Sequence, residues 1–84
     1  MDQSAIMDEL TDIFRKVLGD PTIVLTPQTT AENVQNWNSL NHIIIVVEVE
    51  RRFGVKFVTG EMEELENVGG LAQLIQRRLV KAGR

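Results

Sequence analysis

The chain has 84 residues, a net charge of −3 and no cysteine. A chain of this length buries only about 60% of its unfolded surface, which suits a module serving other proteins better than an enzyme with a deep cleft. The acidic balance argues against a nucleic-acid partner, and the longest apolar run, Ile43 to Val47, is too short to span a membrane. With one histidine and no thiolate, we predict no metal site, and the lack of cysteine fits a cytoplasmic location.

An amphipathic helix is predicted over residues 4–18. Its apolar residues recur at helical spacing and form one core-facing stripe of Ile6, Leu10, Ile13, Phe14, Val17 and Leu18. Ser4 is the expected N-cap, and Gly19 is the expected stop.

Residues 19–38 contain two prolines and several threonines without sustained periodicity, so a long loop is predicted. A loop of this length in a small domain must be pinned to the core. The candidate pins are Ile23, Val24, Leu25, Val34 and Trp37. The pattern also allows a short helical turn near Ala31 to Val34.

A second helix is predicted over residues 39–53, capped by Asn38 or Ser39 and ended by Gly54. One of its apolar stripes contains His42, Ile45, Val46, Val49 and Phe53, and the other contains Leu40, Ile43, Ile44 and Val47. Because Phe53 is too large to be left in water, its stripe is assigned to the core. The Leu40 stripe is then an exposed binding surface. The alternative is a central helix that buries both stripes, and periodicity alone does not decide between them.

Residues 55–60 are predicted to be an extended connection, because one short strand would have no partner. Thr59 is expected to cap a short acidic helix over residues 61–66, with Met62 and Leu65 directed inward. A last helix is predicted over residues 70–81. The predicted fold class is all-α: a small four-helix bundle, with three main helices, one short helix and a long first loop, in a single domain covering residues 1–84.

No catalytic constellation is visible in the sequence. A hydrolase would have to combine Ser39 with His42, but the nucleophile-elbow motif is absent, and we expect His42 to be partly buried with one hydrogen bond. Ser39 differs because the first turn of a helix favours an attached anion by about 0.3–1 kcal/mol. From position alone, a capping role is the simpler explanation of this serine.

The segment Trp37-Asn38-Ser39-Leu40-Asn41-His42, followed by an apolar helix ending Glu50-Arg51-Arg52-Phe53-Gly54-Val55, resembles the acyl carrier protein family. The similarity of helix order covers nearly the whole chain. It implies that Ser39, flanked by Asn38 and Leu40, carries 4'-phosphopantetheine transferred from coenzyme A. Acyl or aminoacyl groups would then be held on the arm as thioesters, in fatty acid, polyketide or nonribosomal peptide biosynthesis.

The resemblance also implies partners. They are a phosphopantetheinyl transferase, a loading ligase and downstream synthase or transferase enzymes, while the chain itself is a carrier, not an enzyme, and is expected to be a monomer. The implied partner surface consists of Leu40, Ile43, Ile44, Val47, Glu48 and Arg51.

One departure from the family pattern is Asn38, where the family motif has an aspartate. This substitution keeps the cap but removes a carboxylate used in docking with the transferase and its magnesium site. Modification of Ser39 is therefore expected to be slower or to need a dedicated transferase. The alternative is an unmodified carrier-fold module that binds partners through the apolar face of the second helix.

Overall fold

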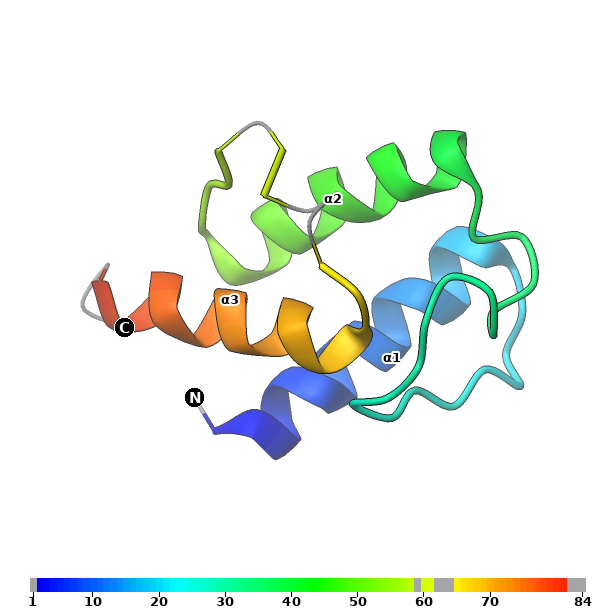
Figure 1. Cartoon of the computed structure of the whole chain (residues 1–84), viewed down its shortest axis with the longest axis horizontal. Coiled ribbons are helices and arrows are strands. Elements are labelled where there is room, and N and C mark those ends of the chain that lie inside the picture. Colours follow the sequence, from blue (N-terminus) through cyan, green and yellow to red (C-terminus); the bar gives the residue numbers. More distant parts are fainter. Residues whose placement is uncertain (1, 59, 62–64, 82–84) are drawn as a thin grey trace.

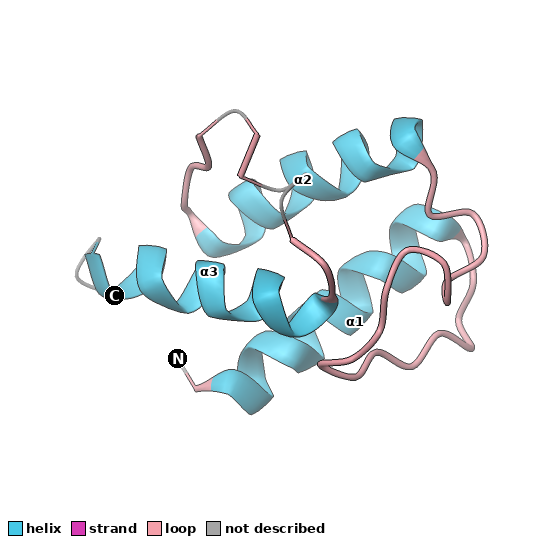
Figure 2. Ribbon diagram, viewed as in Figure 1, coloured by secondary structure: helices cyan, strands magenta, loops and turns pink. Residues whose placement is uncertain are grey.

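The computed structural model describes residues 2–58, 60–61 and 65–81. Their regular secondary structure consists of three helices, α1 (Gln3–Leu18), α2 (Ser39–Phe53) and α3 (Val68–Lys81). Figures 1 and 2 show α2 above α3, with α1 running obliquely past them. The all-α class is therefore confirmed for this part of the chain.

The short fourth helix is not confirmed. Gly60 and Glu61 form a turn, and Leu65 and Glu66 lie outside any helix. The expected cap Thr59 and the expected inward residue Met62 lie outside the described residues. Leu65 is partly buried and packs against the core, as predicted.

The boundaries of α1 follow from its caps. The prediction that Ser4 is the N-cap is wrong, because the side chain of Asp2 accepts a hydrogen bond from the Ala5 N–H at 2.8 Å and the helix begins at Gln3. Gly19 ends the helix with a φ of +67°, a conformation that glycine adopts without steric cost.

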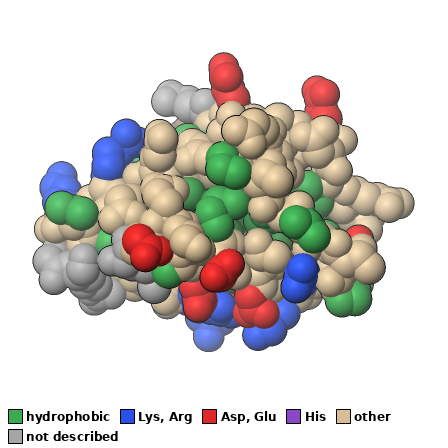
Figure 3. Space-filling model, turned by 90° about the horizontal axis from the view of Figure 1, so that it is seen from below, with side chains coloured by type: hydrophobic (Ala, Val, Ile, Leu, Met, Phe, Trp, Pro, Cys, Tyr) green, Lys and Arg blue, Asp and Glu red, His purple; other side chains and the backbone are tan. Residues whose placement is uncertain are grey.

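The core is formed where the apolar stripes of the three helices meet. Its buried members from the helices are Ile6, Leu10, Ile13, Phe14 and Leu18 of α1, Ile45, Val49 and Phe53 of α2, and Val68, Leu71, Ala72, Ile75 and Leu79 of α3. An ion-pair bridge joins α2 to α1, since Arg52 contacts Glu9 at 2.7 Å and Asp12 at 3.1 Å. Seen from below, acidic and basic side chains lie next to one another along one edge of the molecule (Figure 3).

The long loop is pinned to the core largely as predicted. Ile23 and Leu25 are buried, and Val34 and Trp37 pack against the core while partly exposed. The prediction for Val24 is wrong, because its side chain is 73% exposed. In extended backbone, successive side chains point to opposite sides, so a residue between two buried neighbours faces the solvent. The stretch from Ala31 to Val34 forms a turn without becoming a helix.

The loop is also bonded to the start of α3. The N–H groups of Val68 and Gly69 donate to the carbonyl oxygens of Thr29 and Pro27, each at 2.8 Å. The side chain of Asn67 accepts from the Gly70 N–H at 2.9 Å. These bonds satisfy N–H groups that have no partner within a helix, and they explain why α3 begins two residues earlier than predicted.

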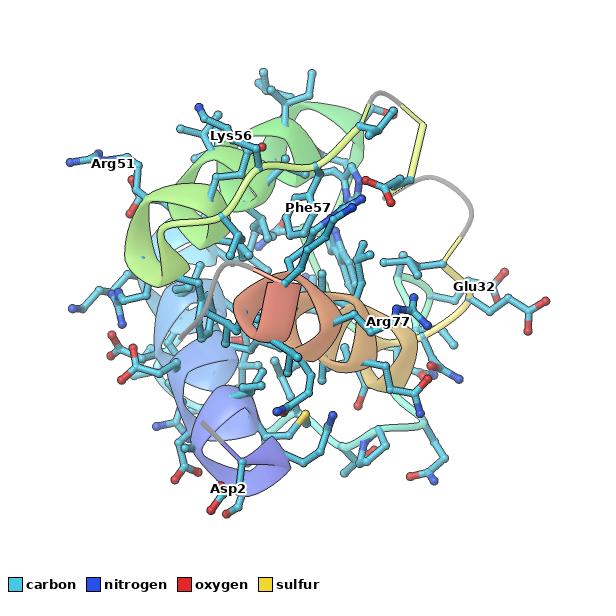
Figure 4. The ribbon with its side chains drawn as sticks, turned by 90° about the vertical axis from the view of Figure 1, so that its left-hand side faces the viewer. Asp2, Glu32, Arg51, Lys56, Phe57 and Arg77 are labelled. Atoms are coloured by element: carbon cyan, nitrogen blue, oxygen red, sulfur yellow. The ribbon has the colours of Figure 1, made fainter. Side chains whose placement is uncertain are left out.

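The segment after α2 has no helix or strand from Val55 to Val58, so the prediction of a connection without a strand is confirmed for these residues. It is held by two carboxylates: Glu50 accepts from the Phe57 N–H at 2.9 Å, and Glu61 accepts from the Val58 N–H. Figure 4 shows Phe57 directed between α2 and α3. No helix among the described residues is long and apolar enough to cross a membrane.

Candidate functional site

The start of α2 is fixed by a network of asparagines. The side-chain oxygen of Asn38 accepts from the Asn41 N–H at 3.0 Å and caps the helix. The side chain of Asn41 in turn donates to the carbonyl oxygen of Asn36 at 2.8 Å. Asn36 has a φ of +71°, which asparagine tolerates better than most residues. The loop is thereby held in place where it enters the helix.

Because Asn38 is the cap, Ser39 is the first residue of the helix and its side chain is exposed. Its hydroxyl forms no hydrogen bond within the described part of the chain. The capping explanation for Ser39 is therefore wrong, and the hydroxyl is accessible beside the free N–H groups of the first turn.

A cavity of about 540 Å³ opens beside Ser39. Its walls come from the loop, the first turn of α2, the segment before α3 and α3 itself. The lining residues are Ala31, Trp37, Asn38, Ser39, His42, Ile43, Leu65, Glu66, Asn67 and Leu71. The sequence pattern points to Asn38, Ser39 and Ile43 as site residues. It does not indicate the lining residues from other segments, because only the fold brings these segments together: Ala31, Leu65, Glu66, Asn67 and Leu71.

Trp37 and His42 form one unit in the cavity wall. The indole Nε1–H of Trp37 donates to Nδ1 of His42 at 3.1 Å, and the two rings stack with centroids 6.1 Å apart. Trp37 also packs edge-on against the buried ring of Phe14 at 4.8 Å. The expected half-buried histidine with one hydrogen bond is thus confirmed, and its ring is anchored to the core through Trp37.

The structure also decides which stripe of α2 is exposed. Leu40 and Ile43 are 68% and 62% exposed, and Ile44 and Val47 are 43% and 46% exposed. On the other stripe Ile45, Val49 and Phe53 are buried, so the alternative of a helix buried on both stripes is wrong. We call the four exposed residues, Leu40, Ile43, Ile44 and Val47, the apolar stripe.

Glu48 and Arg51 border this stripe. Their side chains form an ion pair at 3.2 Å, so their charges offset one another locally. Figure 4 shows Arg51 projecting outward from α2. The structure therefore presents an apolar strip with little net charge beside it.

Comparison with known proteins adds independent information. The family described as "Phosphopantetheine attachment site" matches residues 8–75 of the chain. The acyl carrier protein of Acidothermus cellulolyticus is 28% identical over 82 residues, covering 98% of both chains. The acyl carrier protein of Thermobifida fusca is 25% identical over 75 residues, covering 89% of this chain and 95% of the relative.

A solved structure agrees with these matches. The solution NMR structure of a holo acyl carrier protein from Geobacter metallireducens has a TM-score of 0.84 and 42% sequence identity to this chain. The match covers 92% of this chain and 88% of the other. Since sequence, family pattern and fold agree over most of its length, the chain belongs to the acyl carrier protein family, with a phosphopantetheine attachment domain.

Proposed function

We propose that Ser39 is the residue to which phosphopantetheine is attached. The observation that carries this proposal is the exposed Ser39 hydroxyl at the first turn of α2, beside a cavity of about 540 Å³. A transferase needs access to this oxygen, and no described residue bonds to it. The phosphate of the attached arm would lie near the free N–H groups and the positive end of the helix dipole.

The residues around Ser39 fit such an arm. Trp37, Ile43, Leu65 and Leu71 give the cavity apolar walls, which suit the hydrocarbon part of a cargo. When bound, the arm supplies a thiol that holds acyl or aminoacyl groups as thioesters. The contribution of the chain is to fix the attachment point, through the Asn38 cap, and to cover the attached group.

We propose that the chain itself catalyses nothing. Nδ1 of His42 already accepts the hydrogen bond from Trp37, so this nitrogen is not available as a base for Ser39. This hydrogen bond supports a carrier that presents its cargo to separate enzymes.

The apolar stripe is the proposed docking surface, with Glu48 and Arg51 at its edge. Leu40 directly follows Ser39, so a partner seated on the stripe also reaches the attachment serine. The proposed partners are a phosphopantetheinyl transferase, a loading ligase, and downstream synthase or transferase enzymes. Because apolar contacts dominate this surface, we expect docking to depend weakly on salt.

A second function is favoured by Asn38. Because this residue lacks the carboxylate of the family motif, an unmodified module that binds partners through the apolar stripe is the competing proposal. In either case we propose that residues 1–84 act as one carrier-like domain and as a monomer. We further propose that the protein works in the cytoplasm, without nucleic-acid or membrane partners.

The two functions are separated by intact-mass measurement. The protein is incubated with coenzyme A, magnesium and a broad-specificity phosphopantetheinyl transferase, and the modified peptide is sequenced by fragmentation. A gain of one phosphopantetheine on Ser39, absent in Ser39→Ala, supports the carrier. An unmodified chain whose Asn38→Asp variant is modified supports the interaction module. Equal modification rates for the unchanged chain and Asn38→Asp would show that Asn38 does not slow the transferase.

A further inference from the structure

The imidazole of His42 has a hydrogen-bonding atom that the structure leaves without a partner. His42 lines the cavity beside Ser39. Its Nε2 atom is buried and has no hydrogen-bond partner among the described residues. Buried polar atoms are hydrogen-bonded in the great majority of cases, so this exception calls for an explanation.

The proton on this imidazole can be located from its neighbour. Indole Nε1–H is only a donor, so Nδ1 of His42 must accept and carries no proton. A neutral imidazole with an unprotonated Nδ1 carries its proton on Nε2. The buried atom is therefore an N–H donor that lacks an acceptor.

The position of this donor is fixed relative to Ser39. The two residues are three apart on α2, so their side chains lie on the same side of the helix. The ring of His42 is held by Trp37, which is itself packed against Phe14 in the core. His42 lines the cavity, but its Nε2 atom is buried behind the cavity surface, so a group that extends from Ser39 reaches this oriented donor when the neighbouring wall side chains move aside.

We propose that the Nε2–H of His42 donates a hydrogen bond to a carbonyl oxygen of the group that extends from Ser39, which makes His42 a positioning residue for the arm or its cargo. This inference rests on the proposed attachment at Ser39. A neutral acceptor is favoured over an anion, because the walls are largely apolar and the charged side chain among them is Glu66. Such carbonyls occur in the amides of the arm and in the thioester of the cargo.

Nuclear magnetic resonance of the His42 side chain tests the proposal. The Nε2–H signal is followed in the full chain in three states: unmodified, modified with a free thiol, and modified with a butyryl thioester. Formation of the hydrogen bond is expected to shift the signal downfield and to slow its exchange with water. A change in the thiol state assigns the acceptor to the arm, and a change only in the thioester state assigns it to the cargo.

The result that overturns the proposal is an unchanged Nε2–H signal in both modified states, with intact mass confirming full modification of Ser39. The proposed function survives that result. If Ser39 accepts no phosphopantetheine at all, the proposed function fails, and this inference fails with it. Mass and NMR therefore distinguish the two failures.

A variant supplies a second measurement. His42→Phe removes the donor and keeps a ring, and Glu32→Gln, on an exposed side chain of the loop, is the matched control. We expect the carbonyl carbon signal of the accepting group, in the labelled arm or thioester, to shift on formation of this hydrogen bond in the unchanged protein and in Glu32→Gln, and we expect this shift to be lost in His42→Phe. A carbonyl shift that is the same in His42→Phe as in the unchanged protein overturns the positioning role. If His42→Phe does not fold, the NMR comparison of the unchanged chain still decides.

Discussion

The contact between the long loop and the start of α3 gives a prediction with a built-in control. A Cβ atom at Gly69 would lie 2.9 Å from the carbonyl oxygen of Pro27 and 3.1 Å from its Cβ atom. The backbone of the loop cannot rotate away as a flexible side chain can. At Gly70, the nearest atom to an added Cβ is a terminal methyl of Leu65 at 3.3 Å, which moves easily. The two neighbouring glycines should therefore respond differently to alanine.

The expected loss of stability follows from the hydrogen bonds that the added Cβ atom would weaken. Gly69→Ala must push the loop away and weaken the bonds from Gly69 to Pro27 and from Val68 to Thr29, each worth about 0.5–1.5 kcal/mol. Both alanines gain helix propensity of up to about 1 kcal/mol. This gain cancels in the comparison, so Gly69→Ala should be about 1–3 kcal/mol less stable than Gly70→Ala.

Thermal unfolding followed by circular dichroism measures the difference. In a domain of this size, each kcal/mol corresponds to about 4–8 °C in Tm. Gly69→Ala should therefore melt below the unchanged protein, and Gly70→Ala at or above it. Equal melting temperatures for the two variants would refute the argument that the loop is held close against α3.

Three further predictions concern the caps, the pH and the docking surface. Asn38→Ala should lower the free energy of unfolding, measured by urea titration, by about 1 kcal/mol, whereas Asn38→Asp keeps the cap and should not. An unchanged free energy of unfolding in the alanine variant would contradict the capping role. The hydrogen bond from the Val58 N–H lowers the pKa of Glu61 from its usual 4.5, and the hydrogen bond from Arg78 lowers it further. The ionised carboxylate of Glu61 therefore stabilises the fold fully above pH 4.5, and this stabilisation is lost as the pH falls through the lower pKa of the folded state. Glu61→Gln should therefore flatten the acid side of the Tm–pH profile. A profile identical to that of the unchanged protein would show that ionised Glu61 does not stabilise the fold. Ile43→Glu should lower the kcat/KM of the transferase without lowering Tm, because Ile43 is exposed. For the unchanged protein, kcat/KM should fall little as salt is added, and a steep fall would rule out apolar docking.

Local sequence was sufficient to predict a helix boundary wherever that boundary depends on residues only a few positions apart. The bounds of α2 follow from the Asn38 cap and the Gly54 stop, and both act within one turn. Ser39 was placed in the first turn of this helix in the same way, but its position alone favoured a capping role, and its proposed role as attachment residue came from the family resemblance. The cap of α1 was misplaced because Ser4 and Asp2 are both good caps, and backbone geometry selects between them.

Tertiary structure decided everything that depends on distant segments. Periodicity gave α2 two apolar stripes, and only packing against α1 and α3 showed that the one with Leu40 is exposed. The start of α3 at Val68 depends on carbonyl oxygens of Thr29 and Pro27, about forty residues earlier in the chain. The cavity and the unpartnered Nε2 of His42 are likewise properties of the assembled fold, because a cavity wall exists only once separate segments have packed together.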